Sequence, residues 1–405
     1  MHRFVFVAGF VLSVALRAAA RQPAVLTFEE AITRARASAP AVVAARMRID
    51  ETRARVIGAS LPLATNPTMD VEAGRRTGAA TTTDYGIALA QDFELPARRR
   101  ARIDSARAGV TQEEQRAREI EREVLREVAT TFLRAVEARE RAGTAASGKQ
   151  LADEALQIAQ RRFNAGDVAQ LDVNVARTAI ARAEVEERAA EALLIGQVTR
   201  LKGLLGIAAA EPITIGGSLR DALPVSADEL IASAAERADV RVLDAEIEEA
   251  EAEQRLAKTL RWPELGLRAS YQREGDERVT LGGVGLSLPF FNRGQEATAL
   301  ATARLARLHA ERTALKLAIE ADVRGALASH EALRAASEQY ERTVLPLIEE
   351  NERLALESYD VGQIGLAELL IVRRDALDAR RAFIDQLIET RLAEVELHAR
   401  AGVWK

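Results

Sequence analysis

Two carboxylates stand at matching places in a segment that this chain repeats. The first copy surrounds Gly166 and is followed by Asp172, and the second surrounds Gly362 and is followed by Glu368. In both copies an aromatic residue, a glycine and an acid keep the same order and spacing. A glycine suits a tight turn, and an acid soon after it complements the dipole of a following helix. The repeat indicates two similar halves and favours a structural or conduit role over catalysis.

The other residue types that carry chemistry form no recognisable site. The four histidines, His2, His309, His330 and His398, show no spacing typical of metal ligands. The sequence has no cysteine, so we expect no disulfide, no thiolate metal site and no lipid attached through a thiol. Neither a phosphate-binding loop nor a G-x-S-x-G nucleophile motif occurs. We therefore expect no enzyme activity, no metal site, no cofactor and no means of energising transport.

The composition favours long helices over an ordinary globule. Charged residues make up 29% of the 405 residues and aromatic residues only 4%, which is typical of long helices and coiled coils. The net charge is −5, and the interspersed acids and bases indicate solvated helix faces and no nucleic-acid partner. Residues 1–20 join a charged start, an apolar run and the small residues Ala18-Ala19-Ala20, which predicts a secretory signal peptide.

The first half, residues 21–207, predicts a helix, two strands and a helical hairpin. The first helix runs from Thr27 to about Ala59, and Pro40 interrupts it. Alternation of apolar and polar residues predicts strands over about 67–74 and 84–94. A helical hairpin follows over about 97–205; its first helix continues to about Phe163, and Gly143 and Gly148 weaken its middle, which leaves a break there as the alternative.

A connector over 208–225 leads to a second half, residues 226–405, with the same plan. Ser226 is positioned to cap its first helix. Strands are predicted over about 264–272 and 279–288, with a bulge at Gly282-Gly283, and a helical hairpin over about 290–403. The fold class is therefore mainly helical with a small β part.

The four strands have the length and pattern of a membrane pore wall. Each approaches the roughly 9–11 residues that cross a bilayer when tilted, and each alternates as the wall of a water-filled barrel does. An open sheet edge cannot face lipid, and the smallest common membrane barrels have about eight strands. Several chains would have to share one barrel, and three would supply twelve strands. The alternative is a small soluble sheet, with the apolar helix stripes serving only as core packing.

The repeated segments resemble the TolC-like outer-membrane efflux proteins over nearly the whole chain. The matching pieces are Arg162-Phe163-Asn164-Ala165-Gly166 with Asp172, and Tyr359-Asp360-Val361-Gly362 with Glu368. Two strand-to-helix stretches, Gln91 to Pro96 and Leu288 to Gln295, are most similar to the CzcC-like heavy-metal efflux branch. The order and duplication of these pieces carry the resemblance, since no single piece is decisive.

The resemblance implies a homotrimer in the outer membrane of a Gram-negative bacterium. A 12-stranded β-barrel in outer-membrane lipid would continue into a periplasmic α-helical barrel, and heavy-metal cations would be one cargo. A periplasmic adaptor protein, itself bound to an inner-membrane RND-type pump, would meet the tips of the hairpins. The residues implied at those tips are Ala165, Gly166, Asp167, Val361, Gly362 and Gln363. Asp172, Glu368 and Tyr359 would lie at the entrance, where threefold symmetry makes each acid a ring that favours cations.

This chain departs from the family archetype at two entrance positions. Ile364 and Ile371 stand where the archetype carries an arginine and a second acid, so its salt-bridged gate is not implied here. The acids also have a plainer interpretation as partners of the helix dipole, and Tyr359 as a packing residue. Two other functions compete with the duct, namely a periplasmic adaptor and a coiled-coil scaffold without a pore. Neither explains two hairpins joined to two strand pairs.

Overall fold

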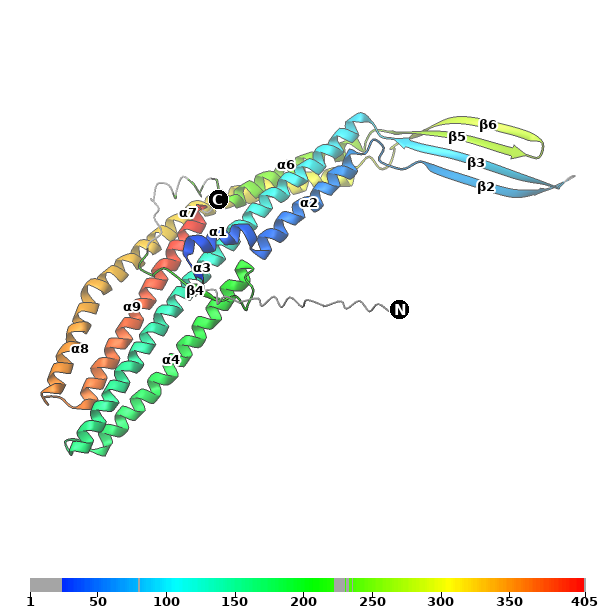
Figure 1. The fold of residues 1–405 in the computed structure, drawn as a ribbon. Coiled ribbons are helices and arrows are strands. Elements are labelled where there is room, and N and C mark those ends of the chain that lie inside the picture. Colours follow the sequence, from blue (N-terminus) through cyan, green and yellow to red (C-terminus); the bar gives the residue numbers. More distant parts are fainter. Residues whose placement is uncertain (1–23, 79–80, 222–229, 231–232, 235, 404–405) are drawn as a thin grey trace, which may run out of the picture.

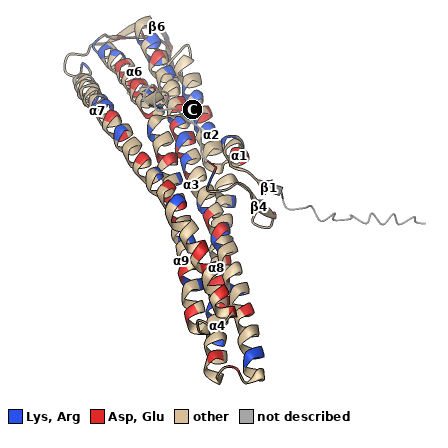
Figure 2. Ribbon diagram, turned by 90° about the vertical axis from the view of Figure 1, so that its left-hand side faces the viewer, with Lys and Arg blue, Asp and Glu red and all other residues tan. Residues whose placement is uncertain are grey.

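The computed structural model describes residues 24–78, 81–221, 230, 233–234 and 236–403. The predicted signal peptide and the capping residue Ser226 lie outside the described residues. The molecule is elongated, with a four-stranded sheet extending from one end of a set of long helices (Figure 1). Acidic and basic residues are interspersed along the helices, as the sequence predicts (Figure 2). Within the described residues, no helix combines the length and the apolarity needed to cross a membrane.

The first half begins with two helices separated by a proline. Helix α1 (Phe28–Ser38) starts at a capping box, in which the backbone N–H of Glu30 donates to Thr27 Oγ1 at 3.3 Å and the N–H of Thr27 donates to the Glu30 carboxylate at 3.0 Å. Helix α2 (Pro40–Ser60) starts at Pro40, whose missing N–H costs nothing in a first helical turn. Two short strands that the sequence does not predict, β1 (Ala24–Leu26) and β4 (Ile213–Ile215), pair in parallel.

Helix α3 (Pro96–Ala165) runs without a break for 70 residues, or roughly 105 Å at the usual rise. The helix predicted from the sequence is confirmed, and it does not break at Gly143 and Gly148. Burial of the surrounding turns offsets the weak helix propensity of glycine, and Gly148 itself lies against the Leu377 side chain. Helix α4 (Gln170–Leu205) then returns along α3.

In the second half the corresponding long helix is interrupted. It follows α6 (Ala238–Thr259) and the strand pair, and consists of α7 (Gln295–Gln339), the π-helix η1 (Tyr340–Val344) and α8 (Leu345–Asp360). Pro346 lies two residues after the π-helix, where its ring and missing N–H disfavour an ordinary helical turn. The predicted helix start at about 290 is too early, because Gly294 adopts a φ of +74° and α7 begins after it.

The last helix, α9 (Leu366–Ala401), lies beside α3, so the lower helices follow the order α8, α9, α3, α4 (Figure 1). The main core lies where α1, α3, α4 and α9 meet, around the fully buried Phe132. The Phe132 ring makes an edge contact with Phe28, at 5.7 Å between ring centroids. The largest other side chains that are almost completely buried in this core are Leu125, Leu201, Leu205, Leu219 and Ile388.

The four long strands form one antiparallel sheet in the order β2-β3-β5-β6. Their bounds are β2 (Thr68–Thr77), β3 (Thr81–Phe93), β5 (Glu264–Glu274) and β6 (Glu277–Ser287). Both hairpins extend two to three residues further toward their turns than the alternation predicts, because backbone pairing continues through polar residues up to Thr77–Thr81 and Glu274–Glu277. The predicted bulge at Gly282-Gly283 is wrong, since these glycines pair in unbroken register with Ala269 and Arg268.

Candidate functional site

Both repeated turns lie at the end of the molecule opposite the sheet (Figure 1). Gly166 has a φ of +85° and Gly362 a φ of +77°, a region that glycine occupies without a steric penalty. The amide of Asp167 donates to the Arg162 carbonyl at 2.9 Å, and that of Gln363 donates to the Ser358 carbonyl at 2.8 Å. A Cβ at either glycine would meet nothing within 4 Å, so the backbone conformation selects glycine here and not the available space.

The two predicted acids cap the helices that follow these turns. The Asp172 carboxylate accepts a hydrogen bond from the Ala169 amide at 3.2 Å, and the Glu368 carboxylate accepts one from the Gly365 amide at 3.0 Å. Within the described chain neither acid forms an ion pair. Asp172 is half-buried and Glu368 is exposed, so both carboxylates keep contact with solvent while they cap. The structure therefore gives them a structural task that is compatible with a charged entrance.

Tyr359 lies inside the junction between the two hairpin tips. Its side chain is only 2% exposed and packs with a tip cluster of buried residues. The Arg162 guanidinium lies 4.4 Å from the ring centroid and also donates to the Tyr359 carbonyl at 3.3 Å. The Tyr359 hydroxyl is buried and has no hydrogen-bond partner among the described residues. The other members of the tip cluster are Ala155, Ala159, Val173, Ala176, Ala355, Leu366 and Leu369.

The two residues at which the chain departs from the archetype, Ile364 and Ile371, lie in different surroundings. Ile364 packs against the cluster and so belongs to the joint between the hairpins. Ile371 is exposed on α9. Ile364 thus makes an apolar contact at the position where the family archetype carries an arginine of its salt-bridged gate.

The sheet has one apolar face and one polar face. Residues directly opposite each other on paired strands share a face, so the register groups Val71 with Ile87, Ile87 with Tyr271, and Leu267 with Val284. This face is solvent-exposed in the single chain, at 65% for Val71 and 71% for Val284. The opposite face carries Asp70, Glu72, Arg268, Ser270 and Gln272.

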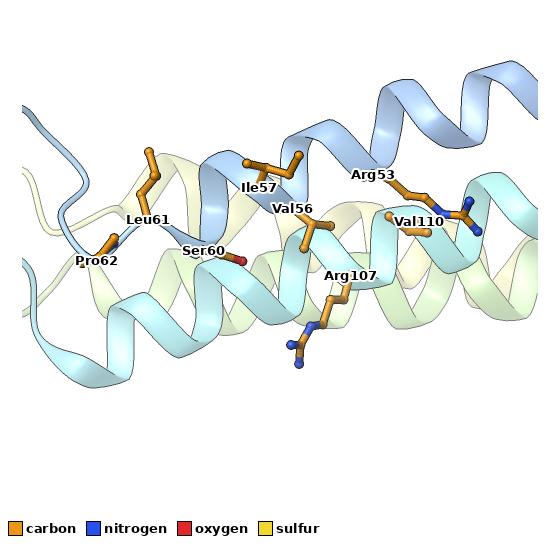
Figure 3. A pocket seen from close by; sticks show the side chains of 8 residues that line it. All are labelled: Arg53, Val56, Ile57, Ser60, Leu61, Pro62, Arg107 and Val110. Carbon is orange, nitrogen blue, oxygen red and sulfur yellow. The ribbon is translucent and has the colours of Figure 1, made fainter.

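A pocket of about 600 Å³ lies between α2 and α3 at their sheet end (Figure 3). Val56 and Val110 lie between the two helices, and Arg107 points away from α2. Arg53 is held by Asp50 and Glu114, each at 3.1 Å. The remaining lining residues are Ile57, Ser60, Leu61 and Pro62, a set without an acid–base pair or a nucleophile with its base.

Sequence reasoning missed one partly buried titratable cluster, because nothing in the spacing of the histidines signals it. Helices α7 and α9 bring His330 and His398 together with Glu394. Burial lowers the pKa of both histidines, and the charge of Glu394 opposes this shift. Over the described ranges, no group of three or more histidine, cysteine, aspartate or glutamate residues is suited to hold a metal ion.

Comparisons with known proteins agree with this architecture. The nickel-cobalt-cadmium resistance protein NccC of Alcaligenes xylosoxydans xylosoxydans is 28% identical over 302 residues, which cover 70% of this chain and 67% of NccC. The CmeC outer membrane channel of Campylobacter jejuni superposes with a TM-score of 0.75 at 16% identity, covering 93% of this chain and 85% of CmeC. CusC gives a TM-score of 0.74 at 18% identity, covering 93% and 92%. At these identities the two structures establish the fold alone.

The family model described as outer membrane efflux protein matches this chain twice, over residues 31–207 and 231–403. The two matches contain the two turns, the two capping acids and all four strands of the sheet. They confirm the resemblance that the repeated segments indicate. The chain belongs to the outer membrane efflux protein family.

Proposed function

We propose that this chain is the exit duct of a tripartite, RND-type efflux system. Three copies form a passive channel that carries substrates from the periplasm to the exterior. One observation carries the proposal. The four-stranded sheet exposes an apolar face, carries polar residues on the other face, and ends in two open edge strands, β2 and β6. Such a sheet is stable in lipid only when its edges pair, and three copies supply a closed wall of twelve strands with the polar face inward.

The tips at the opposite end are the proposed periplasmic entrance. Threefold symmetry turns Asp172 and Glu368 into two rings of carboxylates, which favour cations. Tyr359 contributes by joining the two hairpins, since its ring is buried within the chain. Ala165, Gly166 and Asp167 on one turn, and Val361, Gly362 and Gln363 on the other, are the residues that a periplasmic adaptor would meet. The adaptor would link the duct to an inner-membrane pump.

Heavy-metal cations are the cargo class that we propose. NccC is named for resistance to nickel, cobalt and cadmium. The two strand-to-helix stretches, Gln91 to Pro96 and Leu288 to Gln295, resemble the CzcC-like heavy-metal efflux branch. We also propose that residues 21–207 and 226–405 are duplicated repeats joined by 208–225, which the two family matches support. A pore-free adaptor or scaffold would leave the exposed apolar face of the sheet without a role.

The test combines oligomer mass with conductance. The protein, purified from membranes in a non-ionic detergent, should have the mass of a trimer by native mass spectrometry and give cation-selective steps in planar bilayers. Glu368→Gln and Asp172→Asn should each reduce cation selectivity, because each removes three charges from a ring while leaving an oxygen to cap the helix. Glu251→Gln, an exposed acid near the sheet end of α6, is the matched control. A water-soluble monomer without conductance would contradict the duct.

A further inference from the structure

Arg373 of α9 is a buried cation without an opposite charge. Its side chain is 7% exposed, its Nη1 donates to the Leu151 carbonyl at 3.1 Å, and its Nε is buried without an acceptor. The other buried arginine and glutamate side chains in the described part of the chain are paired. These pairs are Arg122 with Glu119, Arg237 with Asp239, Glu137 with Arg134, and Glu394 with Arg391. Burying a guanidinium without a carboxylate beside it costs free energy. The described residues supply no such carboxylate, so a ligand could provide the missing negative charge.

Arg373 lines a groove of about 540 Å³ between α4 and α9. Helix α3 lies between these two helices and contributes the small residues Gly148 and Ala152 (Figure 1). The Leu377 side chain lies against Gly148, so the floor of the groove is formed by Leu377 together with these small residues of α3. The groove starts at the first turns of α4 and α9, beside the hairpin tips, and it lies within one chain.

The lining of the groove joins positive charge to apolar surface. Arg182 and Arg374 line it with Arg373, and the nearest acid to Arg374 is Asp378, at a weak 3.9 Å. The acid in the lining, Glu186, is already bonded to Arg381. Apolar contact surface comes from Leu171, which is 70% exposed, and from Val175, Leu370, Ile371 and Leu377.

We propose that this groove binds an amphipathic organic anion, with a carboxylate or sulfonate on Arg373 and a compact apolar body over Leu171 and Ile371. The anion supplies the opposite charge that the Arg373 guanidinium lacks, and charge-assisted hydrogen bonds are stronger than neutral ones. Arg182 and Arg374 add attraction at the rim, and the same three cations exclude metal ions from this groove. The proposal needs one folded chain only, so it stands or falls independently of the duct.

The binding test uses naphthalene-2-sulfonate, with the neutral naphthalene-2-sulfonamide as a control for partition into detergent. Isothermal titration of the full protein in a non-ionic detergent should show the sulfonate binding about ten- to a hundredfold more tightly than the sulfonamide, as expected for hydrogen bonds to a charged group. Arg373→Met should abolish this preference. Arg353→Met, an exposed arginine of α8 paired only with Glu357, should leave it intact. Equal affinity for the two probes in the wild-type protein overturns the proposal.

A second measurement separates a ligand-binding arginine from a structural one. Without ligand, Arg373→Met should unfold at the same temperature as the wild-type protein or higher, because an unpaired buried charge gives way to an apolar side chain of similar length. Naphthalene-2-sulfonate should raise the unfolding temperature of the wild-type protein alone. Arg374→Met, an exposed position where folding is not at stake, should weaken sulfonate binding several-fold. Unchanged sulfonate affinity in both variants overturns the proposal.

Discussion

The joint between the hairpin tips should depend on the ring of Tyr359 and not on its hydroxyl. The hydroxyl is buried without an acceptor, so Tyr359→Phe removes a desolvated polar group and should change local stability by less than about 0.5 kcal/mol, or raise it. Tyr359→Ala removes the ring from the tip cluster and from beneath Arg162. Loss of a buried aromatic side chain costs about 3–5 kcal/mol, and the cation–π contact adds roughly 0.5–1 kcal/mol.

Tyr340 provides the matched comparison within the same chain. Its hydroxyl donates to the Ala379 carbonyl at 3.1 Å, so Tyr340→Phe leaves a part-buried carbonyl without this donor and should cost about 1 kcal/mol. Removing the hydroxyl should therefore have a different effect at each of the two tyrosines. Only Tyr340→Phe should weaken the protein measurably.

Amide hydrogen exchange followed by mass spectrometry measures these effects locally. Peptides covering residues 355–369 report opening of the tips, and peptides covering residues 336–346 report the region of Tyr340. Tyr359→Ala should speed exchange at the tips by roughly a hundredfold or more, since about 1.4 kcal/mol corresponds to a factor of ten. Tyr359→Phe should leave it unchanged. If Tyr359→Phe speeds tip exchange as much as Tyr340→Phe speeds exchange at its own site, the hydroxyl has a partner and the reasoning is refuted.

Three further predictions concern stability. Burial lowers the pKa of His330 and His398 in the folded chain, so below the ordinary value of 6.5 the unfolded chain binds more protons; stability is complete above that pH and is lost as the pH falls through the folded pKa values. Thermal unfolding should show this loss as a lower unfolding temperature at pH 5 than at pH 7.5. An equally large drop in unfolding temperature in the double variant His330→Gln/His398→Gln would contradict the prediction. Gly143→Ala should stabilise α3 by roughly 0.5–1 kcal/mol, because the new Cβ meets nothing within 4 Å, whereas Gly148→Ala, with Leu377 Cδ1 at 3.0 Å, should gain less or lose stability. Equal gains in stability for the two variants in denaturant unfolding would show that the Leu377 side chain moves away from the new Cβ without cost. Phe132→Ala should destabilise the main core by about 3–5 kcal/mol, and a loss below about 1 kcal/mol in the same assay would place Phe132 outside that core.

Local chemistry in the sequence was sufficient to predict the tip turns, the helix hairpins and the strand pairs. A glycine that needs a positive φ, a proline that starts a helix and a period of two in apolar residues each act within a few neighbouring residues. Gly166, Pro40 and the run around Ile87 are examples. The roles of Asp172 and Glu368 at an entrance stay predictions, since the structure shows only their capping bonds.

Features that depend on contacts between distant segments could not be predicted in this way. Arg373 has no counter-charge because neither α3 nor α4 provides one beside it. No sequence pattern along α9 predicts this. His330 and His398 meet only because α7 packs on α9. The unbroken path of α3 through Gly143 and Gly148 likewise depends on neighbouring helices, which outweigh local propensity.

The π-helix at Tyr340–Val344 makes the two duplicated halves mechanically unequal. The first half contributes a continuous beam, α3, whose hydrogen bonding never changes period. In the second half the corresponding helix is interrupted by the π-helix between α7 and α8, and residues outside that helix contact the π-helix. Arg220 pairs with Glu341 at 3.1 Å and lies 5.3 Å from the Phe383 ring, on which Tyr340 also stacks. The two halves therefore follow the same plan but differ at this point, because only the second long helix contains a π-helix with a proline in the turn that follows it.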